Sequence, residues 1–262
     1  ADLASSNTEA SYFVAEARFL RAYAYLQLMD MYANVPLVTK VTSELPKQSN
    51  RQEIFSFVET ELNEISSTLA DSGSNEYGRV DKVAAWALLS RLYLNAPVYI
   101  GSDMSSQVIA NAEKAISSSY SLNTSDGNGN GSAYDELFLA DNNKNGSQNE
   151  FIFVVQFDGL NSQNWGGATF MVHAPIGGSM NPSIFGVNGG WGGLRTTKAL
   201  VDKFEYSVTA SNSDGHPTAW SDSRAMFHTD GQNYEMEKVA PFKEGYGVTK
   251  FRNVDVTGAA GS

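Results

Sequence analysis

The segment EARFLRAYAYLQLMDMYANVPLVT, from Glu16 to Thr39, decides the fold that this sequence predicts. Within it and just ahead of it, apolar residues recur at three- and four-residue steps, as on the buried face of an amphipathic helix. This apolar stripe consists of Phe13, Ala17, Leu20, Ala24, Leu28 and Met31. The pattern predicts a helix from Glu9 to Tyr32, which Asn34 and Pro36 end.

Three more helices are predicted in the first half of the chain. The second has apolar residues at helical spacing between Ile54 and Leu69, and Asn50 is placed to cap its N-terminus. The third is predicted from about Asp81 to Tyr99 and the fourth from about Ser105 to Ser118. Four helices in antiparallel pairs indicate a scaffold of the tetratricopeptide kind.

The composition changes after Tyr120, where stretches rich in Asn, Asp, Gly and Ser indicate turns and loops. The run FIFVVQF, from Phe151 to Phe157, has high β-propensity and predicts a strand. We also expect a last helix from Thr197 to Glu205 and short strands near Arg224 to His228 and near Tyr246 to Asn253.

These elements together predict an α+β protein that is predominantly α. Residues 1–122 are expected to form a tetratricopeptide-like helical scaffold, and residues 123–262 a loop-rich part with short strands and helices. Since loops carried by a rigid scaffold commonly hold binding residues, we expect the ligand site in the second part.

Composition excludes several classes of function. Acidic residues outnumber basic ones by 29 to 18, so nucleic acid is a poor candidate partner. The absence of cysteine removes disulfides, thiolate nucleophiles and sulfur-bound zinc, and three scattered histidines form no metal motif. Arg18 and Arg21 on the first helix lie near Glu9 and Glu16, which we interpret as a solvated or intra-helical ion-pair face.

The glycine-rich segment from Asp158 to Gly193 contains the candidate binding residues. Trp165 is followed by two glycines and Trp191 has two glycines on each side, and such small neighbours leave the faces of an indole open for a sugar to stack on. Asn164 and Arg195 are near enough in sequence to donate hydrogen bonds to sugar hydroxyls. The alternative interpretation is that each tryptophan covers the core as a loop plug, and that the polar side chains satisfy loop backbone groups.

Two loops begin with the calcium pattern D-x-[DN]-x-[DN]-G, one at Asp126 and one at Asp141. An EF-hand needs a bidentate Glu at its twelfth position, where these loops have Leu137 and Ile152. Solvated turns are therefore the preferred interpretation, with a looser calcium site as the alternative, and we expect no cofactor. We also expect no catalysis, because the sequence lacks a phosphate loop and a complete nucleophile-elbow pattern.

Several segments resemble the SusD-like (SusD/RagB) family, in the order in which that family has them. The resemblance begins with the opening helix and Pro turn, and only the loops from Asn123 to Gly193 lack a shared pattern. The further matching segments are Gly78-Arg79 ahead of AAWALLSRLYL, Tyr120-Ser121-Leu122, Asn149 to Phe153, TTKALVDKFE from Thr196, Asp222-Ser223-Arg224, and YGVTKF from Tyr246.

The resemblance implies a non-catalytic protein that captures oligo- or polysaccharide at the cell surface and delivers it to a SusC-like TonB-dependent transporter. It implies a location on the extracellular face of a Bacteroidetes-like Gram-negative outer membrane, reached through a lipid anchor that this chain lacks. Family members are longer at both ends, so we interpret the chain as an internal fragment. The alternatives are a helical-repeat adaptor that binds protein or peptide, and, less favoured, a glycoside hydrolase.

Overall fold

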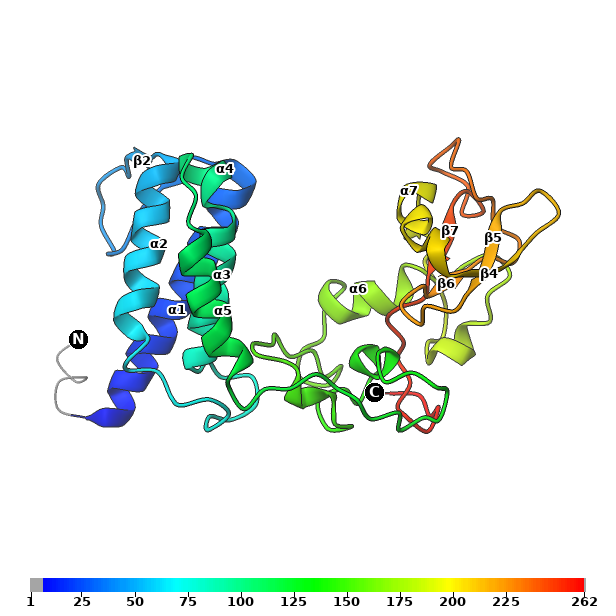
Figure 1. Cartoon of the computed structure of the whole chain (residues 1–262), viewed down its shortest axis with the longest axis horizontal. Coiled ribbons are helices and arrows are strands. Elements are labelled where there is room, and N and C mark those ends of the chain that lie inside the picture. The colour runs from blue at the N-terminus through cyan, green and yellow to red at the C-terminus, as the bar shows by residue number, and fades with distance from the viewer. Residues whose placement is uncertain (1–6, 262) are drawn as a thin grey trace. The chain divides into compact units, whose positions relative to one another are not determined.

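The structure, a computed structural model, describes residues 7–261 and divides them into two compact units. The first unit comprises residues 7–121 and 151–155, and the second comprises residues 122–150 and 156–261. The long helices lie in the first unit and most of the short strands in the second (Figure 1). The predicted fold class, predominantly α with few short strands, is confirmed.

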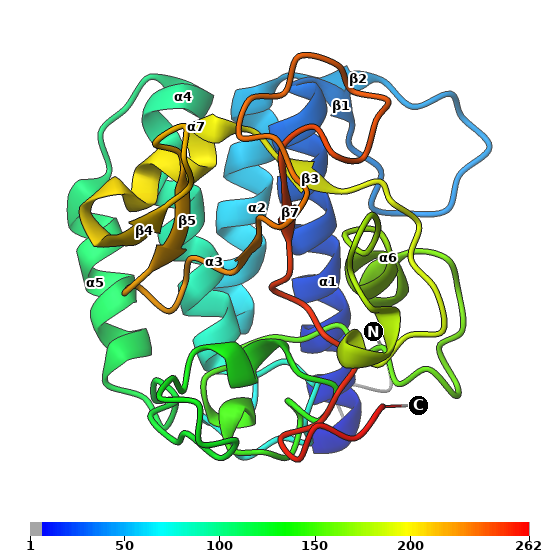
Figure 2. The ribbon, with the colours of Figure 1, turned by 90° about the vertical axis from the view of Figure 1, so that its right-hand side faces the viewer.

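The first unit is a set of packed helices that matches the four predicted ones. Its elements are α1 (Thr8–Tyr32), β1 (Val35–Pro36), β2 (Gln48–Ser49), α2 (Arg51–Ile65), α3 (Lys82–Leu94), α4 (Ala96–Ile100) and α5 (Ser105–Ile116). Helix α1 packs mainly on α2, and α3 mainly on α5, as Figure 2 shows from the side. The predicted third helix is divided into α3 and α4 at Asn95, just before Pro97, whose missing N–H suits only the first turn of a helix.

Side-chain caps fix where α2 and α3 begin. The carboxamide oxygen of Asn50 accepts a hydrogen bond from the Glu53 N–H, and the Glu53 carboxylate accepts one from the Asn50 N–H. This reciprocal capping box starts α2 at the residue that the sequence predicts. The carboxylate of Asp81 caps α3 by accepting hydrogen bonds from the N–H groups of Val83 and Ala84. It also accepts a hydrogen bond from the hydroxyl of Tyr120 at 2.8 Å.

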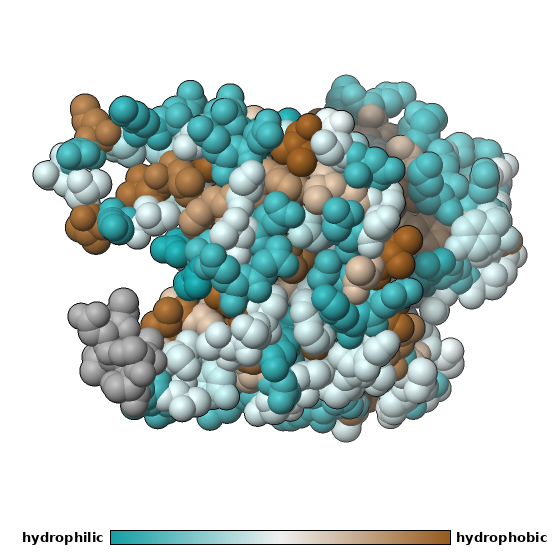
Figure 3. All heavy atoms as spheres, turned by 60° about the vertical axis from the view of Figure 1, so that its left-hand side comes forward, coloured by the Kyte–Doolittle hydropathy of each residue, from teal (hydrophilic) through white to brown (hydrophobic). Residues whose placement is uncertain are grey.

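The buried face of α1 is not the apolar stripe that the sequence analysis chose. The core residues of this helix are Ala15, Phe19, Ala22, Leu26 and Met29. By contrast, Leu20 and Met31 of the predicted stripe are 50% and 64% exposed. The prediction was wrong because α1 carries apolar residues at helical spacing on two faces, and neighbouring helices cover only one. Figure 3 shows hydrophobic residues reaching the surface among hydrophilic ones.

The arginines of α1 pair with α2 rather than within their own helix. Arg18 and Arg21 both bind the carboxylate of Glu61, whose side chain is only 9% exposed, and Arg18 also binds Glu64. Glu16 pairs with Arg79 at 2.7 Å. The interpretation of these residues as a solvated or intra-helical ion-pair face was therefore wrong, because their partners come from elsewhere in the chain.

The ion pairs set the pKa of Glu61. Burial alone would raise the pKa of this carboxyl, but hydrogen bonds and charges from Arg18 and Arg21 outweigh burial and hold the pKa below its usual value. A group with a lowered folded-state pKa stabilises the fold above its unfolded pKa, and this contribution is lost as the pH falls through the folded pKa.

The predicted strand from Phe151 to Phe157 does not form. Ile152 and Phe153 instead pack against the helical core, and the ring of Phe153 lies edge-on to Phe19 with ring centroids 5.3 Å apart. A strand needs a hydrogen-bonded partner, and the structure gives this apolar run helical side chains to pack against instead.

The second unit has short elements joined by loops. They are η1 (Asp135–Phe138), η2 (Ser147–Asn149), α6 (Gly167–His173), η3 (Pro182–Phe185), β3 (Arg195–Thr196), α7 (Lys198–Val201), η4 (Asp202–Ser207), β4 (Val208–Ser211), β5 (Pro217–Trp220), β6 (Phe227–His228) and β7 (Tyr246–Val248). β7 is the central strand of an antiparallel sheet with β3 and β6, while β4 and β5 form a hairpin. The predicted last helix and the two predicted strand regions are present, the helix as α7 followed by η4.

We predict that Glu61→Gln lowers the free energy of unfolding by about 2 kcal/mol at pH 7, because it leaves two arginines without their shared carboxylate. Chemical denaturation at pH 7 and pH 3 measures this. The difference from the parent chain should shrink as the pH falls from the usual pKa of an unfolded glutamate, about 4.3, through the lowered folded-state pKa of Glu61, because that carboxylate is then protonated.

The matched control is Glu64→Gln, which removes an exposed partner of Arg18 alone and should cost less than about 1 kcal/mol. Equal effects of the two substitutions would contradict the assignment of Glu61 as the buried link between α1 and α2.

Candidate functional site

Two tryptophans from separate loops of the second unit lie next to each other at the surface. The ring centroids of Trp165 and Trp191 are 6.1 Å apart with an angle of 45° between the ring planes, and the side chains are 83% and 41% exposed. Phe170 and His173, both on α6, also contact the Trp191 ring. We call these four residues the tryptophan patch.

His173 fixes the orientation of Trp191. Its imidazole is stacked on the indole with centroids 5.2 Å apart and planes 15° from parallel. Since a carbonyl oxygen only accepts, Nδ1 of His173 carries the proton that it donates to the Gly189 oxygen at 2.8 Å. His173 was not among the predicted site residues, although it lies in the same glycine-rich segment as both tryptophans.

Backbone hydrogen bonds hold the Trp191 loop against the end of α6. The Trp191 N–H donates to the carbonyl of His173, and the Gly192 N–H donates to that of Ile176. The N–H groups of Gly193 and Leu194 both donate to the carbonyl of Ala174. Main-chain hydrogen bonds between the loop and residues 173–176 therefore hold the backbone of Trp191 in place.

The glycine before Trp191 is required by close packing. A Cβ atom on Gly190 would lie 2.1 Å from the carbonyl oxygen of Ile176, whereas a Cβ on Gly189 would meet nothing within 4 Å. Gly190 thus permits two backbone segments to approach each other, which is one of the main uses of glycine. The sequence pattern predicted only that these glycines leave the faces of the indole open, not that Gly190 is needed for packing.

The structure does not turn the two predicted polar residues toward the indoles. The side-chain oxygen of Asn164 accepts a hydrogen bond from the Gly166 N–H at 2.7 Å and closes the turn that contains Trp165. The guanidinium of Arg195 donates to the carbonyls of four residues and lies over the Phe242 ring. These carbonyls belong to Gly193, Val239, Pro241 and Glu244. Both residues therefore organise loops that carry or adjoin the patch.

A tight turn precedes Trp165. The carboxylate of Asp158 accepts hydrogen bonds from the Asn161 side chain and from the backbone N–H groups of Ser162, Asn161 and Leu160. These bonds lower the pKa of Asp158 to about 2, so the turn keeps a full negative charge at neutral pH. The side-chain amide of Asn161 donates a hydrogen bond to Asp158 within this turn.

The calcium-like loop at Asp126 is closed by its own backbone, whereas the Asp141 carboxylate accepts hydrogen bonds from the Asn145 side chain and from the N–H of Val256. The carboxylate of Asp126 accepts hydrogen bonds from the N–H groups of Asn130 and Gly131. Within residues 7–261, no group of three or more His, Asp or Glu side chains is arranged to hold a metal ion.

Trp220 is not part of the patch. Its ring lies edge-on to Phe227 and Tyr246, with centroids 5.2 and 6.5 Å away, between strands β5, β6 and β7. These contacts agree with a structural role for this residue.

Comparison with known proteins identifies the family. The SusD-like family model, described as starch-binding and associating with the outer membrane, matches residues 2–94. The starch-binding protein SusD of Bacteroides thetaiotaomicron is 35% identical over 191 residues, which make up 72% of this chain and 33% of that protein. The chain belongs to the SusD/RagB family.

Solved structures support the same assignment. A SusD superfamily protein from Parabacteroides distasonis matches this SusD-like chain with a TM-score of 0.62 and 26% identity, over 92% of this chain and 48% of that one. A SusD-like protein from Bacteroides fragilis matches with a TM-score of 0.56 and 28% identity, over 83% of this chain and 39% of that one. The SusD-like chain thus spans about a third of the curated relative and less than half of either structure.

In residues 7–261 of this SusD-like chain, none of the helices combines the length and apolar composition needed to span a membrane.

We predict that Gly190→Ala displaces the Trp191 loop and lowers the free energy of unfolding by about 1–3 kcal/mol, because the new methyl group overlaps the Ile176 carbonyl. The indole N–H resonance of Trp191 in a ¹H–¹⁵N spectrum should shift markedly. Gly189→Ala is the control and should leave this resonance and the stability nearly unchanged. The same shift in both variants would contradict the close-packing role of Gly190.

Proposed function

We propose that this chain is the part of a SusD-like protein that captures oligo- or polysaccharide without changing it chemically. The pair of exposed indoles at Trp165 and Trp191 carries the proposal. The starch-binding name of the Bacteroides thetaiotaomicron relative supports it, since that protein shares 35% identity over 72% of this chain.

The indoles suit a sugar for two physical reasons. Large aromatic faces bury much apolar surface when the C–H face of a pyranose ring lies on them, and side chains with few rotatable bonds lose little entropy on binding. Such residues also dominate the energetics of many binding surfaces. Because Trp191 is stacked on His173 and held by its loop backbone, little ordering is needed before a ligand binds.

The angle between the indoles bears on which glycans fit. With ring planes 45° apart, a ligand that lies on both indoles must bend between neighbouring sugar residues. We therefore propose that the patch prefers curved chains, such as α-linked glucans, over flat ribbons.

Asn164 and Arg195 act in this proposal mainly by shaping the loops. Asn164 sets the turn of Trp165, and Arg195 joins the segment after Trp191 to residues 239–244. Their loss would disturb the spacing between the indoles rather than remove a direct contact with the glycan.

We further propose that the intact protein works on the extracellular face of the outer membrane and passes its glycan to a SusC-like TonB-dependent transporter. The family description, which includes association with the outer membrane, supports the location. The delivery step rests on the family resemblance of the helical scaffold.

We predict that Trp165→Ala and Trp191→Ala each weaken glycan binding about tenfold, since each removes one stacking surface. Affinity gel electrophoresis with amylopectin, laminarin, xyloglucan and a soluble mannan identifies the ligand, and isothermal titration gives the affinities. Tyr32→Ala, which removes an aromatic ring that is exposed on α1, is the control and should bind as the parent chain does.

Three outcomes would count against the proposed function. Unchanged retention in the double tryptophan variant would overturn the patch as the site. A parent chain that binds none of the glycans would favour the protein-binding adaptor, and release of new reducing ends would indicate a glycoside hydrolase.

A further inference from the structure

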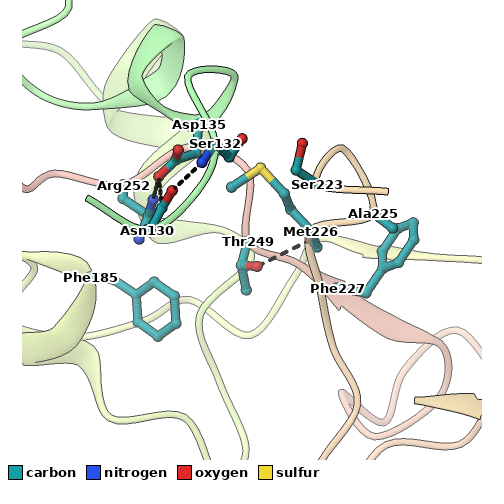
Figure 4. Close-up of a pocket in the computed structure, with 10 residues that line it drawn as sticks. All are labelled: Asn130, Ser132, Asp135, Phe185, Ser223, Ala225, Met226, Phe227, Thr249 and Arg252. Atoms are coloured by element: carbon teal, nitrogen blue, oxygen red, sulfur yellow. Dashed lines mark hydrogen bonds and ion pairs between the residues drawn. The ribbon is translucent and has the colours of Figure 1, made fainter. Parts of the chain in front are cut away.

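The second unit contains a pocket of about 360 Å³ that has no residue in common with the tryptophan patch. Figure 4 shows a polar wall that includes Asn130, Asp135 and Arg252, and the apolar rings of Phe185 and Phe227 on either side of Thr249. The volume lies near the lower end of the range of about 300–1,000 Å³ that is usual for small-molecule sites.

The polar wall contains an ion pair whose carboxylate, from Asp135, is buried and uses only one of its oxygens. Oδ2 of Asp135 accepts hydrogen bonds from Arg252 Nη2 at 2.5 Å and from the side-chain amides of Asn128 and Asn130 at 3.1 and 2.8 Å. Asp135 is only 3% exposed. Within residues 7–261, however, its Oδ1 and the Nε of Arg252 are both buried and have no hydrogen-bond partner.

Unpaired buried polar atoms are unfavourable, and native proteins normally satisfy them. Here one unpaired atom is an acceptor, Oδ1 of Asp135, and the other is a donor, Nε of Arg252. A hydroxyl group can donate to the first and accept from the second, whereas a carboxylate or an ammonium group can serve only one of them. The hydroxyls of Ser132 and Ser223, which also line the pocket, add polar contacts of the same kind.

The charge and the apolar surface of the pocket restrict the chemical class of ligand further. Because Asp135 and Arg252 neutralise each other, neither an anion nor a cation finds an unpaired charge of opposite sign in their pair. The rings of Phe185 and Phe227 and the side chain of Met226 offer apolar surface to the C–H faces of a ring. A ligand with several hydroxyls on a compact apolar ring can therefore contact both the polar and the apolar side chains of the pocket.

We propose that this pocket is a second saccharide subsite that holds one neutral sugar residue through the Asp135–Arg252 pair. The inference goes beyond the proposed function, because the subsite shares no residue with the tryptophan patch and would bind a sugar without it. The subsite selects uncharged, hydroxyl-rich rings, whereas the tryptophan patch provides stacking surfaces alone.

The test uses the full chain carrying Trp165→Ala and Trp191→Ala, so that the patch contributes nothing. The probes are methyl α-D-glucopyranoside, methyl β-D-galactopyranoside and methyl α-D-mannopyranoside, added in ligand-observed saturation-transfer NMR. At least one should give a saturable signal and should shift the methyl resonance of Met226, which Met226→Leu assigns. Tetrahydropyran, which keeps the ring and lacks the hydroxyls, should give neither.

Ser223→Phe fills the pocket with a ring and leaves the Asp135–Arg252 pair in place, so the signal and the shift should both be lost. Ser213→Phe makes the same change at an exposed serine of the β4–β5 turn and should retain both. Thermal unfolding of each variant confirms that it is folded. The subsite is overturned if none of the glycosides binds, if Ser223→Phe binds as well as Ser213→Phe, or if tetrahydropyran binds equally.

Discussion

Burial of one face of α1 is the constraint on which the helical unit depends. Phe19, Leu26 and Met29 are buried almost completely in the cluster formed with the other helices. Such burial is the main favourable term in folding, and each large side chain contributes about 1.5–3 kcal/mol relative to an exposed one. Residues 151–155 return from the loop-rich part of the chain to the same core, where Phe153 contacts both Phe19 and Tyr23.

The tryptophan patch and the loops around it depend on polar main-chain and side-chain contacts more than on an apolar core. The buried apolar cluster beneath the tryptophan patch is small, with Ile176, Met180 and Val187 at its centre. The loops that surround it are held by backbone hydrogen bonds, by the carbonyl contacts of Arg195 and by the close approach at Gly190. Segments stabilised in this way keep a defined shape without regular secondary structure.

The patch and the pocket would recognise a carbohydrate by different means. Stacking on Trp165 and Trp191 reads the apolar face of any sugar ring and tolerates variation in its hydroxyls. In the proposed subsite, the unsatisfied atoms on Asp135 and Arg252 would instead favour a hydroxyl in a defined place.

The sequence by itself determined the helices, the Asn50 cap and the family. Helical spacing, the Asn50 cap and Pro36 are local signals that act over a few residues, so they could be predicted without coordinates. It also singled out Trp165 and Trp191 from their glycine neighbours. Tertiary structure alone decided which face of α1 is buried, because both faces carry apolar residues and only packing against α2 and α3 selects one.

The dependence on tertiary packing also explains the other differences between the predicted and the observed structure. Glu61 follows Arg18 and Arg21 by some forty residues, and the Phe151 run meets helices instead of a strand, so neither partner was visible in local spacing. The pairing of Asp135 with Arg252 likewise joins positions far apart in the chain. Local sequence specifies elements through short-range geometry, whereas a binding surface depends on distances that exist only after the chain has packed.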